Sequence, residues 1–290
     1  MNVIEIKGLT KYYGKHMGIE NVSLAVEEGE IFGFIGPNGA GKSTTIRVLL
    51  ALIKPTAGGA TIFGKDCVKD AADIARDVGY LPGESAYYDN MTVRELAKYA
   101  ADLYGKNCDG RTEELSGRLQ LDLKRKIADL SLGNKKKAGI VCALLHSPKL
   151  IILDEPTNGL DPLIQQEFYS ILREENARGA TVFFSSHVLS EVQKICDRVA
   201  IIKEGGVVGV QKISELRANS HKKISVTADA IPEGHFGVPG VENYSQEGGA
   251  AEFMFMGDVA DILARLASLR VRDLLIEEPT LEEIFMHYYR

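Results

Sequence analysis

The sequence contains no tryptophan, few cysteines and no apolar run of membrane-spanning length. The four cysteines, Cys67, Cys108, Cys142 and Cys196, are far apart and form no CxxC pair, so they indicate neither a zinc cluster nor a disulfide framework. We therefore expect a reducing compartment. No stretch reaches the roughly 18 apolar residues of a membrane span, and the first residues show no signal-peptide core, so we expect no bilayer crossing by this chain.

An excess of positive charge is also missing. The 290 residues carry 34 Lys and Arg against 40 Asp and Glu, a formal net charge of −6. This balance gives the whole molecule no attraction for nucleic-acid phosphates, so no nucleic-acid partner is expected. Hydrophobic residues make up 45% and charged residues 26%, a composition typical of globular proteins. The length suits one large or two modest domains.

Short apolar runs predict an α/β fold. Runs at 31–35, 150–154 and 181–186 have the continuous apolar character of parallel strands that are buried on both faces. A helix is predicted over 42–53, after the first run, and another over 164–178, between the other two. Strands that alternate with helices in this way favour a parallel sheet.

Residues 86–130 differ from this pattern and predict a helical insert. Its clearest helix begins at Thr92, which with Glu95 fits a capping box. Two strands around Gly205 and Gly206 predict a hairpin.

The last part of the chain predicts a small appended α/β domain. It contains strands over 223–227 and 252–255, a helix over 259–268, and a final helix capped by Thr280 with Glu283. We therefore predict a first domain over 1–211 and an accessory domain over 212–290.

A phosphate-binding loop is predicted at GPNGAGKST, which matches GxxxxGK[ST] between a strand and a helix. Glycines let successive backbone N–H groups converge on phosphate oxygens, and the helix adds the positive end of its dipole. Lys42 would supply a cation for the β and γ phosphates, and the Ser43 hydroxyl would ligate Mg²⁺. The predicted ATP-binding residues are Gly36, Asn38, Gly39, Gly41, Lys42, Ser43 and Thr44.

Two acids lie at the end of an apolar strand: Asp154 is the last residue of LIILD, and Glu155 follows it. The carboxyl ends of strands are where an open α/β sheet binds its ligands. Asp154 would hold Mg²⁺, directly or through water, and Glu155 would act as general base toward an attacking water. Alone, such a pair is typical of a solvated loop; combined with the glycine loop, it predicts an ATPase.

The order of the motifs resembles that of the ATP-binding subunit of ATP-binding cassette (ABC) transporters. Over about residues 1–210 the sequence contains KYYG, the glycine loop, LSLGN, LDEPTNGLDP and SSH, in that order. The resemblance implies a P-loop NTPase core of RecA-like type with an antiparallel β subdomain and an α-helical subdomain, followed by the small α/β domain.

The resemblance also implies roles for individual residues. Tyr13 would stack on adenine, and Tyr12 is the less favoured alternative because the family's aromatic residue usually precedes the glycine directly. Ser131 and Gly133 of LSLGN would contact nucleotide held by another subunit. His187 would contact the γ-phosphate as a third catalytic residue beside Glu155 and Lys42.

Two places depart from the family pattern. In LSLGN, Leu132 and Asn134 replace a glycine and the glutamine of the usual signature. In GYLPGE, Gly83 stands where the family places a glutamine that senses Mg²⁺ and the membrane partner. Either Glu84 substitutes as an oxygen ligand of the metal, or coupling relies less on this loop.

The basic run at 135–137 is expected to be a solvated helix face; the alternative is attraction to ATP phosphates or to anionic lipid.

Partners follow from the resemblance. One copy of each motif implies that two chains, a homodimer or a paralogue pair, form two ATP sites, with 158–161 as the loop that crosses the interface. A separate membrane permease would dock near 83–104 and hold the chain at the cytoplasmic face of the cell membrane.

The tail from residue 212 resembles those of subunits that serve drug, antibiotic and polymer exporters of bacteria, which favours export. Two alternatives remain: a soluble ABC ATPase that acts on ribosomes or DNA, and a nucleotide-binding regulator with little turnover.

Overall fold

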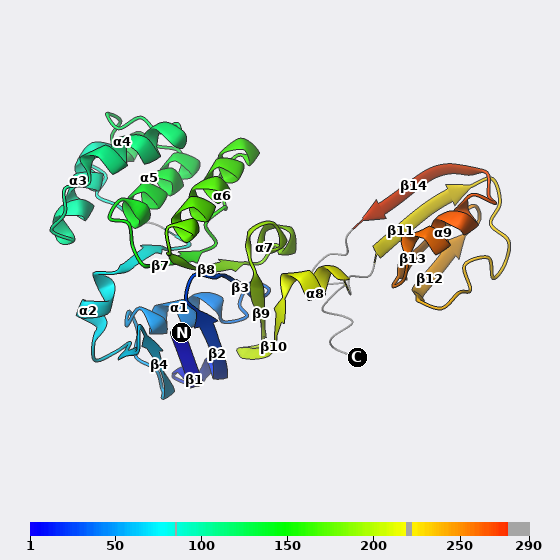
Figure 1. The fold of residues 1–290 in the computed structure, drawn as a ribbon, viewed down its shortest axis with the longest axis horizontal. Coiled ribbons are helices and arrows are strands. Elements are labelled where there is room, and N and C mark those ends of the chain that lie inside the picture. The colour runs from blue at the N-terminus through cyan, green and yellow to red at the C-terminus, as the bar shows by residue number, and fades with distance from the viewer. Residues whose placement is uncertain (85, 219–221, 278–290) are drawn as a thin grey trace. The chain divides into compact units, whose positions relative to one another are not determined.

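The computed structural model describes residues 1–84, 86–218 and 222–277. The chain divides into two compact units, Met1–Ile213 and Ser214–Arg290, which are coloured blue to green-yellow and yellow to red in Figure 1. Each unit has a hydrophobic core of its own. No helix in the described part of the chain combines the length and apolarity needed to span a membrane.

A six-stranded sheet of order β10-β9-β3-β8-β7-β6 lies at the centre of the first unit. All its neighbouring strands run parallel except the β9–β10 hairpin, which confirms the hairpin predicted around Gly205. Every residue of β3, β7 and β8 is buried, as predicted for parallel strands covered on both faces. The strands are β3 (Ile31–Ile35), β6 (Val78–Leu81), β7 (Leu150–Asp154), β8 (Thr181–Ser186), β9 (Arg198–Lys203) and β10 (Gly206–Lys212).

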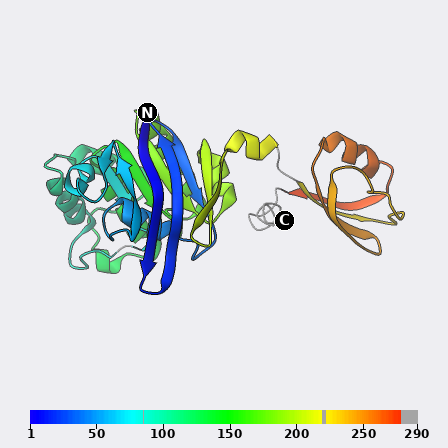
Figure 2. The same ribbon diagram turned by 90° about the horizontal axis from the view of Figure 1, so that it is seen from below.

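A second, antiparallel sheet of order β2-β1-β4-β5 belongs to the same unit. Figure 2 shows its two long strands β1 and β2 in dark blue. Their buried residues, among them Ile4 and Ile19, share a core with Phe34 of the central sheet and Ile46 of α1. The strands are β1 (Asn2–Tyr13), β2 (His16–Glu27), β4 (Ala57–Ile62) and β5 (Lys65–Asp66).

The helices of the first unit are α1 (Lys42–Leu49), α2 (Ala71–Ala75), α3 (Val93–Leu103), α4 (Asp109–Arg118), α5 (Leu132–Leu144), α6 (Pro162–Ala177) and α7 (Leu189–Ile195), with a 3₁₀ turn over Ile127–Asp129. The capping box of α3 is confirmed: Glu95 N donates to Thr92 Oγ1 at 3.2 Å, and Thr92 N donates to Glu95 Oε2 at 2.7 Å. Helix α1 is shorter than predicted because Ala51 adopts a left-handed backbone, φ 56°.

The second unit contains a four-stranded antiparallel sheet of order β12-β13-β11-β14 and helix α9. The elements are α8 (Ile213–Ala218), which begins at the junction, β11 (Lys222–Ala228), β12 (Val241–Glu247), β13 (Ala250–Phe255), α9 (Val259–Leu266) and β14 (Val271–Glu277). Strands β11 and β13 and helix α9 were predicted from the sequence, whereas β12 and β14 were not. The predicted helix capped by Thr280 and Glu283 lies outside the described residues.

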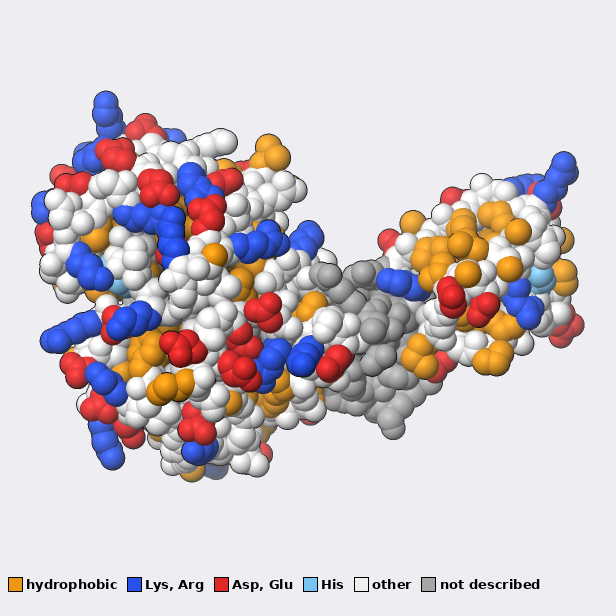
Figure 3. All heavy atoms as spheres, in the orientation of Figure 1, with side chains coloured by type: hydrophobic (Ala, Val, Ile, Leu, Met, Phe, Trp, Pro, Cys, Tyr) orange, Lys and Arg blue, Asp and Glu red, His pale blue; other side chains and the backbone are white. Residues whose placement is uncertain are grey.

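Figure 3 shows positive and negative side chains interspersed over the visible face of the first unit.

Candidate functional site

The glycine loop joins β3 to α1 at the carboxyl edge of the central sheet. Gly39 and Gly41 have φ values of 81° and 108°, a backbone region that favours glycine. A Cβ on Gly41 would lie 2.5 Å from Ile19 Cγ2, so this position also lacks room for a side chain. The local sequence thus fixes a loop whose backbone turns tightly before the helix begins.

Lys42 opens helix α1 and is almost completely buried, at 6% exposure. Its ammonium donates to Gly36 O at 2.6 Å and to Pro37 O at 3.2 Å, and therefore lies within the curve of the loop. The next residues, Ser43 and Thr44, are half-buried. Asn38 and Gly39 are exposed at the outer side of the loop.

Asp154 lies at the end of β7, opposite Ser185 of β8 in the sheet register. Ser185 Oγ donates to Asp154 Oδ1 at 2.8 Å, and the carboxyl group is buried. Sequence reasoning missed Ser185, although its position as a polar residue near the end of an apolar strand was a usable signal.

Glu155 follows with a left-handed backbone, φ 48°, which is uncommon for a residue with a side chain. Its amide donates to Ser185 O at 3.2 Å. Glu155 Oε1 is buried and lies 3.1 Å from Lys42 Nζ, an ion pair that lacks hydrogen-bond geometry. Glu155 Oε2 lies 2.7 Å from Nδ1 of His187, the residue after β8.

The structure thus brings the three predicted catalytic residues, Lys42, Glu155 and His187, into one cluster. They come from α1, from the end of β7 and from the end of β8. A buried cation, a carboxylate and an imidazole in contact can bind phosphate and move a proton.

Tyr13 lies beside this loop. A Cβ built on Gly18 would lie 2.8 Å from Tyr13 Cε2 and 3.1 Å from Thr44 Cγ2, so the ring is close to the first turn of α1. Its side chain is 44% exposed. Tyr12 is engaged elsewhere, because its hydroxyl donates to Glu20 at 2.6 Å, a hydrogen bond that raises the pKa of Tyr12.

Ser131 and Gly133 lie apart from the Lys42 cluster. Ser131 caps α5 by accepting from Asn134 N at 3.3 Å, and it is exposed. A Cβ on Gly133 would lie 2.5 Å from Gly159 O, so LSLGN packs against the loop over 158–161. In the described part of the chain, no hydrogen bond joins Ser131 to the cluster. Leu132, at 74% exposure, projects from the surface.

The turn after β6 places Gly83 beside Asp154. A Cβ on Gly83 would lie 3.5 Å from Asp154 O and 3.6 Å from Asp154 Oδ2. The side chain of Glu84 is exposed, and among the described residues it forms no ion pair. In this turn, the residue beside the predicted metal ligand Asp154 is therefore a glycine, while the predicted ligand Glu84 is exposed.

Lys136 was missed by sequence reasoning. The expectation that 135–137 is a solvated face was wrong, because Lys136 and Lys137 are only 5% and 8% exposed. The Lys136 ammonium donates to Gly83 O at 2.8 Å, Glu155 O at 3.2 Å and Pro82 O at 3.3 Å. The helical period was the available signal, since Ile140, four residues later, is buried.

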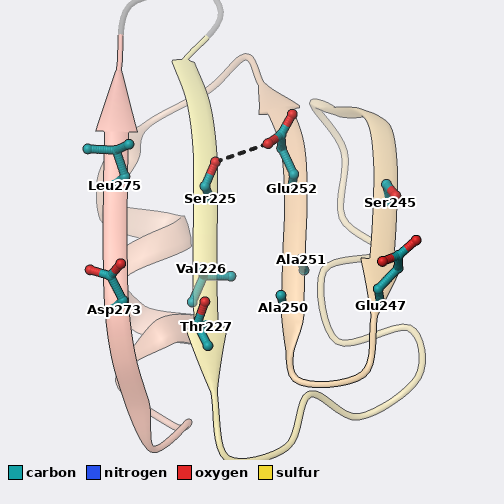
Figure 4. Close-up of a pocket in the computed structure, with 10 residues that line it drawn as sticks. All are labelled: Ser225, Val226, Thr227, Ser245, Glu247, Ala250, Ala251, Glu252, Asp273 and Leu275. Carbon is teal, nitrogen blue, oxygen red and sulfur yellow. Dashed lines mark hydrogen bonds between the residues drawn. The ribbon is translucent and has the colours of Figure 1, made fainter.

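A separate shallow pocket of about 290 Å³ lies on the sheet of the second unit, and Figure 4 shows its lining. Its polar groups come from all four strands and include Ser225, which donates to Glu252 at 3.4 Å. No residue of the predicted ATP site belongs to it.

The loop after β3, its buried lysine and the acids at the end of β7, two strands away in the same parallel sheet, define a P-loop NTPase. Residues 19–158 match the family model for ABC transporters. Residues 212–289 match the model for the C-terminal domain of DrrA1-3-like ATP-binding proteins. The chain is 35% identical to the bacitracin transport ATP-binding protein BcrA of Bacillus licheniformis, with 98% of this chain and 96% of BcrA covered.

Solved structures give the same result. An ATP-binding subunit of an ABC transporter is 33% identical, with a TM-score of 0.70 over 74% of this chain and 92% of that one. A dimeric ATP-binding cassette in a post-hydrolysis state, bound to ADP and phosphate, is 25% identical, with a TM-score of 0.66 over 72% of this chain and 98% of that one. The chain belongs to the ABC transporter family as an ATP-binding subunit, and it is an ATPase. The predicted fold class is confirmed.

Proposed function

We propose that this ATPase powers a separate membrane permease that exports a drug or antibiotic, and that Lys42, Glu155 and His187 carry the hydrolysis. The observation that supports this assignment is the direct contact of Glu155 with both other residues at the phosphate loop. The bacitracin transport function named for BcrA supports an antibiotic cargo.

In this proposal each residue has one task. The Lys42 ammonium binds the β and γ phosphates, and the loop from Gly36 to Thr44 surrounds them with amides. Glu155 takes the proton of the attacking water through its buried oxygen Oε1, which has no hydrogen-bond partner in the described structure. His187, held at Glu155 Oε2, orients the carboxylate and contacts the γ-phosphate.

Asp154 and Ser43 would hold Mg²⁺. The donor set fits, because a buried carboxylate and a hydroxyl are the hard oxygen ligands that this ion prefers. Bound Mg²⁺ neutralises phosphate charge. Glu84 remains a candidate ligand only if its exposed side chain turns inward, so we assign the metal first to Asp154 and Ser43.

A second copy of this chain, or a paralogue, would complete each ATP site. Ser131 is exposed at the start of α5, where its hydroxyl and the nearby Gly133 amide are available to the nucleotide of a partner. The dimeric assembly of a solved relative supports this arrangement. We further propose that Tyr13, rather than Tyr12, stacks on adenine.

The permease would dock on the helical region of the first unit. Large apolar side chains are exposed there: Tyr88 at 60%, Tyr99 at 42% and Leu103 at 70%. Such a group suits contact with another protein. Docking would place the chain at the cytoplasmic face of the cell membrane.

ATP binding by the purified protein tests the phosphate site. Lys42→Ala should abolish binding in a filter assay, because it removes the buried cation that faces the phosphates. The exposed Lys69 provides the control, and Lys69→Ala should bind ATP normally. Retained micromolar binding by Lys42→Ala would remove this assignment.

Isolation of the tagged chain from cells tests the partner. A polytopic membrane protein should accompany it after mild detergent extraction. Recovery with ribosomes and no membrane protein would instead favour the soluble class of ABC ATPase.

A further inference from the structure

Lys136 is a buried cation whose three N–H donors match three backbone carbonyls. Its acceptors are Pro82 O and Gly83 O after β6 and Glu155 O after β7. Among the described residues it forms no ion pair. The position of Lys136 is constrained, because its ammonium is buried and is hydrogen-bonded to the backbones of two separate loops.

Burial of an ammonium is costly unless hydrogen bonds and nearby charge offset the cost. Burial lowers the pKa of Lys136, while the carboxylates of Asp154 and Glu155 act in the opposite direction. These acids are the residues assigned above to Mg²⁺ and to the attacking water. The positive charge of Lys136 thus lies near the two carboxylates of the proposed ATP site.

The same side chain connects three parts of the molecule. Lys136 belongs to the second turn of α5, the helix that Ser131 caps. The Gly83 carbonyl belongs to the turn beside Asp154. The Glu155 carbonyl belongs to a residue with a strained backbone, whose amide is already held by Ser185.

Both backbone polar groups of Glu155 are therefore hydrogen-bonded. Its amide donates to Ser185 O, and its carbonyl accepts from the Lys136 ammonium. Without Lys136, the Glu155 carbonyl loses this hydrogen bond, and the backbone that positions the carboxylate is held less firmly.

We propose that Lys136 is a positioning residue that fixes the Glu155 peptide and the Gly83 turn to the start of helix α5, so that the surface facing a partner subunit and the general base move as one body. The inference rests on the proposed function, because it takes Glu155 as the base. Lys136 itself touches no reacting atom in this account.

The test compares Lys136→Met with Lys135→Met in the full-length protein. Methionine keeps the length and the apolar stem of the side chain but removes the charge and the donors. Lys135 is the matched control, since it neighbours Lys136 on α5 and its nearest carboxylate, Asp89, is 3.8 Å away. The measurements are kcat, the ATP dissociation constant and amide hydrogen exchange without nucleotide.

We expect Lys136→Met to lower kcat at least tenfold, to change the dissociation constant less than threefold, and to speed exchange in the peptides around Gly83 and Glu155. Lys135→Met should resemble the wild type in all three. A purely structural role would lower binding and turnover together, and that result would overturn the proposal.

If Lys136→Met does not fold, Lys136→Gln takes its place, because its amide keeps two donors; a smaller fall in kcat is then expected. A folded variant with kcat within twofold of wild type and unchanged exchange contradicts the inference. A wild-type protein without hydrolysis would instead refute the proposed function, and the exchange measurement would still decide the role of Lys136.

Discussion

Glu155 lies 3.1 Å from the ammonium of Lys42, so the proposed base and the phosphate-binding cation are paired with one another. The Glu155 carboxylate partly neutralises the Lys42 ammonium, to which the triphosphate would also bind, and it repels the phosphate oxygens. The pair therefore links the strength of ATP binding to the charge state of the base.

Glu155→Gln should keep or tighten ATP binding and reduce turnover by about a hundredfold or more, since the amide removes the repulsion but cannot accept the proton. Light scattering should then detect an ATP-bound dimer that persists. Lys69→Ala serves again as the neutral comparison. If turnover were unchanged in Glu155→Gln, another residue would have to be the base.

The two neighbouring tyrosines should differ in their effect on nucleotide affinity. Tyr13→Ala is expected to weaken ATP binding about tenfold, because base–aromatic stacking contributes about 1–3 kcal/mol. Tyr12→Phe removes only the hydrogen bond to Glu20 and should leave the affinity unchanged. Titration calorimetry measures both. If Tyr12→Phe weakened ATP binding and Tyr13→Ala did not, the adenine contact would have to be assigned to Tyr12.

Two glycines near the site should respond differently to a methyl group. A Cβ on Gly36 would lie 2.2 Å from Ile202 O, a backbone atom of β9, so Gly36→Ala should destabilise the first unit by about 1–3 kcal/mol. Gly83→Ala places its methyl at ordinary contact distance from Asp154 and should change stability by less than about 0.5 kcal/mol. Urea unfolding distinguishes these outcomes; equal stabilities would mean that β9 does not approach the loop so closely.

His146 should make the protein sensitive to mild acid. It is buried, its ring stacks on Tyr104 at 3.6 Å, and burial, followed by the Lys106 charge, lowers its pKa to about 4. The unfolded chain takes up a proton below pH 6.5 but the folded chain does not, so stability falls as the pH drops from 6.5 toward 4.

This histidine alone should cost about 2 kcal/mol between pH 7 and pH 5. His146→Phe keeps a ring but cannot be protonated, so urea unfolding should show a smaller loss over the same interval. The exposed His16 supplies the control, and His16→Asn should leave the pH dependence as in the wild type. An unaltered slope in His146→Phe would show that other groups cause the acid sensitivity.

The parts of the site that lie within one continuous stretch could be predicted from the sequence. The glycine loop places its chemistry on successive amides and one lysine, so a local pattern identifies it. Asp154 and Glu155 could be assigned to the site because they follow an apolar strand, and the carboxyl ends of such strands are where an open α/β sheet binds its ligands.

Contacts between residues on different strands and helices could not be predicted from such local patterns. The pairing of His187 with Glu155 depends on the neighbouring positions of β7 and β8, and the backbone angle of Glu155 is set by its contacts. The burial of Lys136 was not predicted, because a run of three lysines is typical of a solvent-exposed face. Its position on α5 places its side chain in the interior.

In the second unit, β12 and β14 are exposed along most of their length, so they lack the apolar alternation that predicts a strand.

Strand β3 and the phosphate loop come early in the chain, yet both neighbours of β3, β8 and β9, come from near the end of the first unit. During translation, nearly the whole unit must therefore leave the ribosome before this strand gains a hydrogen-bonded neighbour. Until then, the four apolar side chains of the segment Ile31–Ile35 are available to chaperones and to aggregation. Within the first unit, the ATPase centre thus matures late, although its lysine is among the first residues to be synthesised.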